Sequence, residues 1–151
     1  MSSSPHVLCP ACGTVNRVPR DRPAAQARCG GCHAPLFSGR PVDVDADAFA
    51  RHVRANEIPV LVDVWAPWCG PCRVMGPMFE RAAGILEPEL RLLKLNADTA
   101  QQVTAEFGVR GIPAMLLFQG GRLVGQTAGA MQTNAIVDWV RGQLSQAGRA
   151  A

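Results

Sequence analysis

The 151-residue sequence has no tyrosine, one lysine, and no apolar run of the roughly 18–20 residues that span a membrane. Its N-terminus lacks the basic segment and apolar core of a secretory signal. These absences argue against a membrane protein and against export, so we expect a cytoplasmic location. Without export, the six cysteines are expected to bind metal or to act in catalysis rather than to form structural disulfides.

Four of the six cysteines form two Cys-x2-Cys pairs, namely Cys9 with Cys12 and Cys29 with Cys32. Their spacing is typical of a structural zinc site, in which four thiolates complete a tetrahedron and leave no open position. His6 and His33 lie beside the pairs, but four cysteines already complete the coordination, so we expect neither histidine to be a ligand. Two labile disulfides or an iron site are the alternatives to one structural zinc ion.

These pairs define a small zinc-ribbon-like module, which we assign to residues 1–38, before a Ser-Gly-Arg-Pro boundary at 38–41. Its apolar residues are too few to fold it alone, so metal binding is expected to supply much of the folding free energy. Residues 1–41 carry five arginines against one aspartate, and the zinc-bound thiolates reduce this excess to about +2. Nucleic acid is therefore not expected as a partner.

Residues 39–151 alternate strand-like apolar runs with helical patterns, which predicts an α/β domain with a mixed central sheet and helices on both faces. Pro77 predicts a kink in a long helix, and Gly120-Gly121 predicts a hairpin turn. Helices are expected at about 45–56, 69–86, 99–107 and 133–146, and strands at 42–44, 59–65, 90–96, 114–118 and 123–127.

The last two cysteines lie in the run Trp-Cys-Gly-Pro-Cys at 68–72, between an apolar strand and a helix. Cys69 precedes the helix, where the helix dipole favours the thiolate that attacks disulfides. Cys72 lies one turn inside the helix and is expected to be less accessible. This arrangement predicts reversible dithiol–disulfide exchange, with Cys69 as the nucleophile and Cys72 as the resolving thiol.

From residue 39 onward the sequence resembles the thioredoxin family. The matching features are Trp-Cys-Gly-Pro-Cys at 68–72, Asp63, Pro77, Ile112-Pro113, Gly121 and Gly129. With the four-cysteine module, the whole chain resembles the zinc-containing thioredoxin 2 type. The resemblance implies a thioredoxin fold and a protein disulfide reductase, which acts on protein disulfides and is recharged by an NADPH-dependent thioredoxin reductase.

Several further residues acquire expected roles. Burial in an apolar strand raises the pKa of Asp63, which suits it to accept the proton of Cys72. Lys94, the only lysine, is expected on the adjacent strand, where it would tune Asp63. A structural Asp63 bonded to the backbone and an ordinary solvated Lys94 are the alternatives. The residues expected to contact substrate are Trp68, Gly70, Pro71, Ile112 and Pro113, the last in a cis peptide bond.

Three other functions compete with the reductase. A disulfide isomerase or oxidase is the first, although Gly70-Pro71 between the cysteines resembles reductases. The second is a zinc-dependent binding or chaperone-like protein, and the third is a redox sensor in which oxidation of the zinc thiolates ejects the metal. We expect a monomer.

Overall fold

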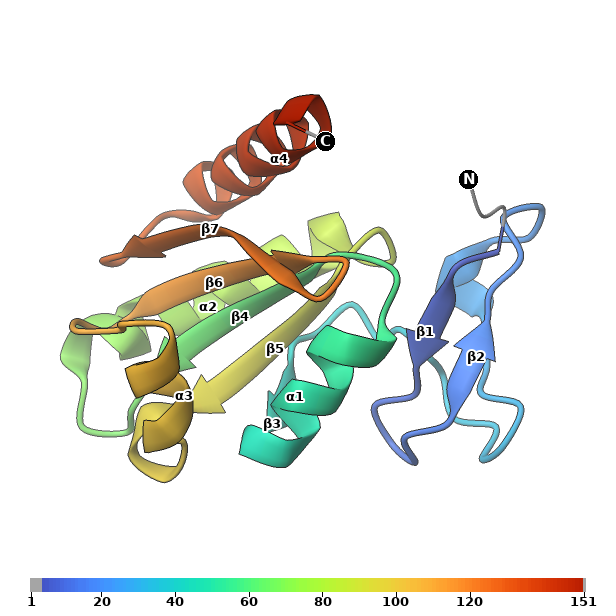
Figure 1. Cartoon of the computed structure of the whole chain (residues 1–151), viewed down its shortest axis with the longest axis horizontal. Coiled ribbons are helices and arrows are strands. Elements are labelled where there is room, and N and C mark those ends of the chain that lie inside the picture. The colour runs from blue at the N-terminus through green and yellow to red at the C-terminus, as the bar shows by residue number, and fades with distance from the viewer. Residues whose placement is uncertain (1–3, 151) are drawn as a thin grey trace.

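The computed structural model describes residues 4–150, which form one small and one large sheet (Figure 1). Residues 1–3 and 151 lie outside the described residues. The first three belong to the N-terminal segment in which we expect no export signal. Among residues 4–150, none of the helices has the length and hydropathy of a membrane span.

The N-terminal part is built on two short antiparallel strands, β1 (His6–Leu8) and β2 (Val15–Arg17), and a 3-10 turn, η1 (Ala24–Gln26). A small apolar cluster fills it, and Ile58, from beyond residue 39, completes that cluster. The members from the N-terminal part are Val7, Cys9, Val18, Cys29, Leu36 and Phe37.

The large sheet has the strand order β3-β5-β4-β6-β7. The central strand β4 pairs in parallel with β5 and antiparallel with β6, so the sheet is mixed as expected. Gly120 and Gly121 have positive φ angles of 61° and 80° and form the expected hairpin turn between β6 and β7. The strands are β3 (Val42–Val44), β4 (Val60–Trp65), β5 (Arg91–Asn96), β6 (Ala114–Gln119) and β7 (Arg122–Ala128).

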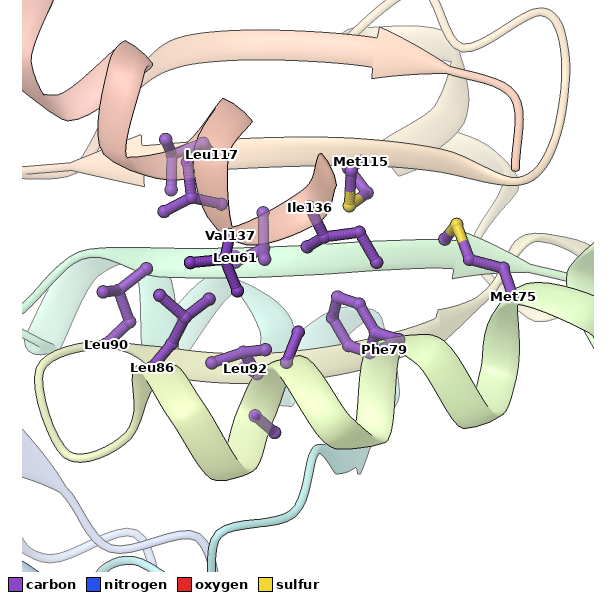
Figure 2. Packing of buried hydrophobic residues seen from close by; sticks show 13 residues of the cluster. Leu61, Met75, Phe79, Leu86, Leu90, Leu92, Met115, Leu117, Ile136 and Val137 are labelled. Atoms are coloured by element: carbon purple, nitrogen blue, oxygen red, sulfur yellow. The ribbon is translucent and has the colours of Figure 1, made fainter. Parts of the chain in front are cut away.

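Helices cover both faces of this sheet because alternate strand residues point to opposite sides. Leu61, Leu92 and Met115 pack under α2 and α4 (Figure 2), whereas Val60, Val62 and their neighbours pack under α1 and α3. The helices are α1 (Ala46–Ala55), α2 (Gly70–Leu86), α3 (Gln101–Glu106) and α4 (Thr133–Ala150), with a 3-10 turn η2 (Ala97–Thr99) before α3.

The N-terminal part packs against the end of the sheet at which β4 and β5 begin, through the buried side chain of Arg91. Its guanidinium donates to the backbone carbonyls of Leu36 at 2.8 Å and Leu8 at 3.3 Å. It also pairs with the buried carboxylate of Glu87 at 3.4 Å and lies 4.7 Å from the centre of the Phe37 ring. The sequence pattern alone left open whether this module packs against the domain. One buried cation joins the two parts.

The end of α1 forms a second connection. The side-chain oxygen of Asn56 accepts from the backbone N–H of Leu8 at 2.8 Å. Glu57 accepts from the backbone N–H of His6 at 2.6 Å and lies 2.8 Å from Nδ1 of the same histidine. The His6 ring thus lies against Glu57, just beyond the end of α1.

Replacing Arg91 with methionine should destabilise the protein strongly. The substitution keeps much of the side-chain volume but leaves the Glu87 carboxylate and two carbonyls buried without their partner. We expect the free energy of unfolding to fall by about 3 kcal/mol, measured by urea denaturation, and proteolysis near residues 38–41 to accelerate. Arg141→Met, at an exposed position of α4, is the control and should change stability by less than about 0.5 kcal/mol. Equal stability of the two variants would contradict the role given to Arg91.

Candidate active site and metal centre

The sulfurs of Cys9, Cys12, Cys29 and Cys32 all lie within 4.8 Å of one another. The Sγ atoms of Cys9 and Cys32 are 3.7 Å apart, and those of Cys12 and Cys29 are 3.5 Å apart. A tetrahedral zinc ion with Zn–S bonds of about 2.3 Å requires sulfur–sulfur distances of about 3.8 Å. Four sulfurs drawn from two distant turns therefore fit one zinc ion, whereas the pairs within each Cys-x2-Cys motif are not joined as disulfides.

The two cysteine turns have the same backbone construction. In each turn the first cysteine donates its N–H to the carbonyl five residues later, and its own carbonyl accepts from the N–H four residues later. These bonds, between 2.8 and 3.0 Å, are Cys9 to Thr14, Gly13 to Cys9, Cys29 to Ala34 and His33 to Cys29. The backbone hydrogen bonds of each turn therefore hold its two cysteines in place without help from a metal ion.

Hydrogen bonds to the sulfurs favour the thiolate form that a metal needs. The backbone N–H of Gly31 lies 3.2 Å from Sγ of Cys29, and that of Ala11 lies 3.4 Å from Sγ of Cys9. Backbone donation from Cys32 and the side-chain amide of Asn16 lower the pKa of the Cys29 thiol. This site fits a closed, structural metal centre.

At the other end of the sheet, Cys69 and Cys72 form a disulfide across the first turn of α2. Cys69 is the N-cap residue, and its sulfur accepts from the backbone N–H of Cys72 at 3.2 Å. The residues are 4% and 5% exposed, so the expected difference in accessibility is absent from this disulfide form. The difference that the fold does provide is positional: Cys69 caps the helix and Cys72 belongs to it.

Asp63 lies on the face of β4 that points toward α2, as does its neighbour Leu61. Its side chain is buried, and its Oδ1 atom has no hydrogen-bond partner among the described residues. Burial raises the pKa of Asp63 to about 7, and the charge of Lys94 opposes that rise. A carboxyl group with this pKa can take up and release a proton near neutral pH.

Lys94 is paired with Asp63 in the register between β4 and β5, so the two side chains lie side by side on one face. Its Nζ atom lies 4.9 Å from the centre of the Trp65 ring, a cation–π contact. Lys94, Glu80 and Cys72 line an open hollow of about 490 Å³. The hollow gives water access to Cys72 from the side of Lys94.

The surface around the disulfide is formed by three separate segments. Trp68 is 68% exposed, and its indole N–H lies 3.1 Å from both carboxylate oxygens of Asp98. The carbonyl oxygen of Ile112 lies 3.7 Å from Sγ of Cys69, and the Ile112–Pro113 bond is cis. The other two residues expected at this surface, Gly70 and Pro71, are exposed beside the disulfide.

Asp98 and Arg73 contribute to this site, although the sequence analysis assigned them no such contact. Asp98, on η2, orients the Trp68 ring from 30 residues away, and no local pattern signals such a partner. Arg73, in α2, donates to the carbonyl of Pro67 at 2.7 Å and holds the loop that carries Trp68. This contact depends on how the loop folds back, which the position of Arg73 after the second cysteine does not reveal.

A disulfide at a helix N-terminus can open and close while the strand beneath it stays fixed, and a neutral carboxyl group nearby can exchange protons. The fold and this site therefore define a thiol–disulfide oxidoreductase. The family described as Thioredoxin matches residues 40–142, and the family described as Thioredoxin 2, N-terminal, a zinc ribbon, matches residues 8–34. The chain belongs to the thioredoxin family and carries that zinc ribbon at its N-terminus, as the sequence resemblance predicted.

Similar proteins support this assignment. Thioredoxin C-3 of Corynebacterium nephridii is 34% identical over 140 residues, which cover 93% of this chain and 96% of that protein. The chloroplastic M-type thioredoxin of Chlamydomonas reinhardtii is 40% identical over 68% of this chain and 73% of its own length. A thioredoxin of Rickettsia felis is 35% identical over 65% of this chain and 93% of its own length. Disulfide oxidoreductase activity follows from this membership.

Asp63 should make stability depend on pH. The pKa of Asp63 is higher in the folded protein, about 7, than the ordinary value of 3.8, so ionisation of the carboxyl opposes folding. The neutral carboxyl group therefore contributes its full stabilisation below pH 3.8, and this contribution is lost as the pH rises to about 7. Asp63→Asn, which cannot ionise, should be more stable than the parent at pH 8 by up to about 4 kcal/mol.

Urea denaturation of both proteins between pH 4 and pH 8 measures this effect. The advantage of Asp63→Asn should shrink steadily as the pH falls and nearly vanish close to pH 4. Asp138→Asn, at an exposed position of α4, is the control and should show no such trend. A difference between Asp63→Asn and the parent that is constant with pH would contradict the raised pKa.

Proposed function

We propose that this protein is a protein disulfide reductase that works through Cys69-Gly-Pro-Cys72. The observation that carries the proposal is the disulfide at the N-terminus of α2, with Asp63 buried on the strand beneath it. A helix N-terminus favours the thiolate of Cys69 once the disulfide is reduced, because the partial positive charge of the helix stabilises an anion. The thioredoxin relatives support reduction of disulfides as the direction of the reaction.

The reaction begins with the dithiol form. The Cys69 thiolate attacks one sulfur of a substrate disulfide, that S–S bond breaks, and a mixed disulfide forms while the other substrate sulfur leaves as a thiolate and takes a proton. Cys72 then loses its proton, attacks Sγ of Cys69 and releases the second substrate sulfur. The substrate gains two electrons, and the protein ends with the Cys69–Cys72 disulfide.

Asp63 is the acceptor for the proton of Cys72 in this proposal, through a water molecule. A pKa near 7 allows the carboxylate form to exist at neutral pH and still bind a proton readily. Lys94 favours the carboxylate form because its positive charge lowers the pKa of Asp63 against the effect of burial. It is thus a tuning residue that acts through Asp63.

Substrate is proposed to lie along the exposed surface beside Cys69. Trp68 provides an apolar face, and Gly70 and Pro71 offer little steric hindrance to an approaching disulfide. The segment of Ile112 and cis-Pro113 lies against Cys69, where it would present its backbone to an extended substrate peptide. Recognition of backbone rather than side chains would let many protein disulfides react.

The remaining proposals concern partners and organisation. A thioredoxin reductase that uses NADPH would return the disulfide to the dithiol. We divide the chain into a zinc-binding module at 1–38 and a thioredoxin domain at 39–151, with one zinc ion held by Cys9, Cys12, Cys29 and Cys32 in a structural role. We also propose a cytoplasmic monomer that does not act on nucleic acid.

Cys72→Ser should trap the reaction halfway. Without the resolving thiol, Cys69 forms a mixed disulfide that cannot be released, so substrate should stay covalently attached and turnover should fall by about two orders of magnitude or more. Non-reducing electrophoresis with mass spectrometry of the adduct measures this. Cys69→Ser is the matched control and should form no adduct; adducts through Cys72 would reverse the assigned roles.

A second assay separates a reductase from an isomerase or oxidase. A reductase should sustain NADPH oxidation when the parent protein is mixed with thioredoxin reductase and a protein disulfide.

Cys29→Ser should abolish the metal site without abolishing exchange at Cys69. We expect zinc to fall from one ion per chain to nearly none, because three ligands bind a structural zinc poorly. Amide hydrogen exchange should become fast in residues 6–37 and stay slow in β4. Cys32→Ser should behave alike, whereas His33→Ala should keep its zinc. Full zinc content in Cys29→Ser would contradict the four-cysteine site.

A further inference from the structure

The N-terminal module carries an open hollow of about 490 Å³, and the charged residues that line it take no part in the proposed reductase chemistry. Arg17, Arg22 and Arg28 contribute the charged side chains, and Val18, Pro23 and Leu36 are among the apolar ones. Among the described residues that line it, none is acidic and none is aromatic. Arg28 is held by donation to the carbonyl of His33 at 3.1 Å.

A second hollow continues this surface. It shares Arg17, Pro19 and Arg22 with the first, and Arg20 and Asp21 also line it. One carboxylate against four guanidinium groups gives the combined surface a net positive charge, which the zinc-bound thiolates of the same module would reduce in part. We call the part formed by Arg17, Arg22 and Arg28 the arginine surface. It is concave, partly apolar and continuous over two hollows, which suits an extended ligand better than a single small anion.

The chemistry of this surface favours an acidic protein segment. Guanidinium groups bind carboxylates through paired hydrogen bonds, and the apolar walls suit the aliphatic parts of neighbouring residues. Single-stranded nucleic acid is usually held by aromatic side chains that stack on the bases, and the described lining offers none. Carboxylate-bearing peptide is therefore the better match.

We propose that the arginine surface docks an acidic segment of a partner protein whose disulfide is reduced at Cys69. The two sites lie at opposite ends of the sheet, because the module packs where β5 begins at Arg91 and the disulfide follows the end of β4 at Trp65 (Figure 1). The six residues of β4 between these ends alone span about 20 Å. A protein can bridge a separation longer than that strand, whereas a small molecule cannot.

Docking at a distance raises the local concentration of the substrate disulfide near Cys69. It should thus act on KM and on the salt dependence of the reaction, and leave the chemical steps unchanged. This consequence rests on the proposed reductase function, but binding at the arginine surface does not. The two can be measured separately.

The first test is binding of a fluorescent oligoglutamate peptide to the full-length, zinc-loaded protein, followed by fluorescence anisotropy. In the double variant Arg17→Gln/Arg22→Gln we expect affinity to fall by about fivefold or more. The control is Arg122→Gln/Arg141→Gln, which removes the same charge from exposed positions of β7 and α4 and should bind almost as the parent does. Zinc content and melting temperature show that both variants are folded.

Equal weakening in the two double variants would mean that only net charge matters, and it would overturn the proposal. So would unchanged binding in Arg17→Gln/Arg22→Gln. Tighter binding of oligothymidylate than of oligoglutamate, lost in the same variant, would assign the surface to nucleic acid instead.

The second test compares reduction of two disulfide peptides that differ only in an acidic or a neutral tail. KM for the acidic peptide should rise in Arg17→Gln/Arg22→Gln by the factor seen in binding, with kcat and the neutral peptide unaffected. Equal KM values for the two peptides in the parent protein would overturn the link to catalysis. Failure of the parent protein to reduce either peptide would instead refute the reductase function and leave the binding result intact.

Discussion

The organisation of the protein depends on burying β4 on both faces. The run from Val60 to Trp65 is apolar except for Asp63, and its two neighbours in the sheet and the helices on each side remove it from water. Burial on both faces fixes the register, because a shift by one residue would exchange the residues facing α2 for those facing α1. The same register brings Asp63 to the α2 side and lets the chain leave the strand directly into the loop that carries Cys69.

Two buried ionisable groups interrupt the apolar strands β4 and β5, and they serve different ends of the molecule. Arg91 opens β5 and pairs through its two terminal nitrogens with Glu87 and with carbonyls of the N-terminal part, while its Nε atom has no hydrogen-bond partner among the described residues. Asp63 has Lys94 beside it in the register, but its Oδ1 atom lacks a hydrogen-bond partner in the described chain. Arg91 holds two parts together through several partners, whereas Asp63 has a pKa near 7 and can change its protonation state.

The N-terminal module combines three kinds of stabilisation, none of which would suffice for so small a piece. Its apolar cluster is completed by Ile58, its backbone is bonded to Arg91, Asn56 and Glu57, and its cysteine turns fit a zinc ion. Small domains commonly need such additions because they bury little apolar area. The docked arrangement fixes the arginine surface relative to the disulfide, so binding at one end can assist reaction at the other.

The sequence by itself determined the features that depend on short stretches of chain. Cysteine spacing predicted the metal centre, apolar periodicity predicted the strands and helices, and Trp-Cys-Gly-Pro-Cys predicted the redox site. Such predictions are possible because turn geometry and the alternation of side chains are set by near neighbours. The resemblance to the thioredoxin family added the cis bond before Pro113, which periodicity cannot reveal.

Only the tertiary structure decided what the isolated charges do. Arg91 and Asp63 have the same signature, a charged residue in an apolar strand, yet one joins the two parts and the other lies under the disulfide. Their partners come from up to 83 residues away, as do the contacts of His6 with Glu57 and Trp68 with Asp98 at 51 and 30 residues. Such pairs form only when the whole chain is packed, because nothing in the local sequence identifies which distant group a buried charge will meet.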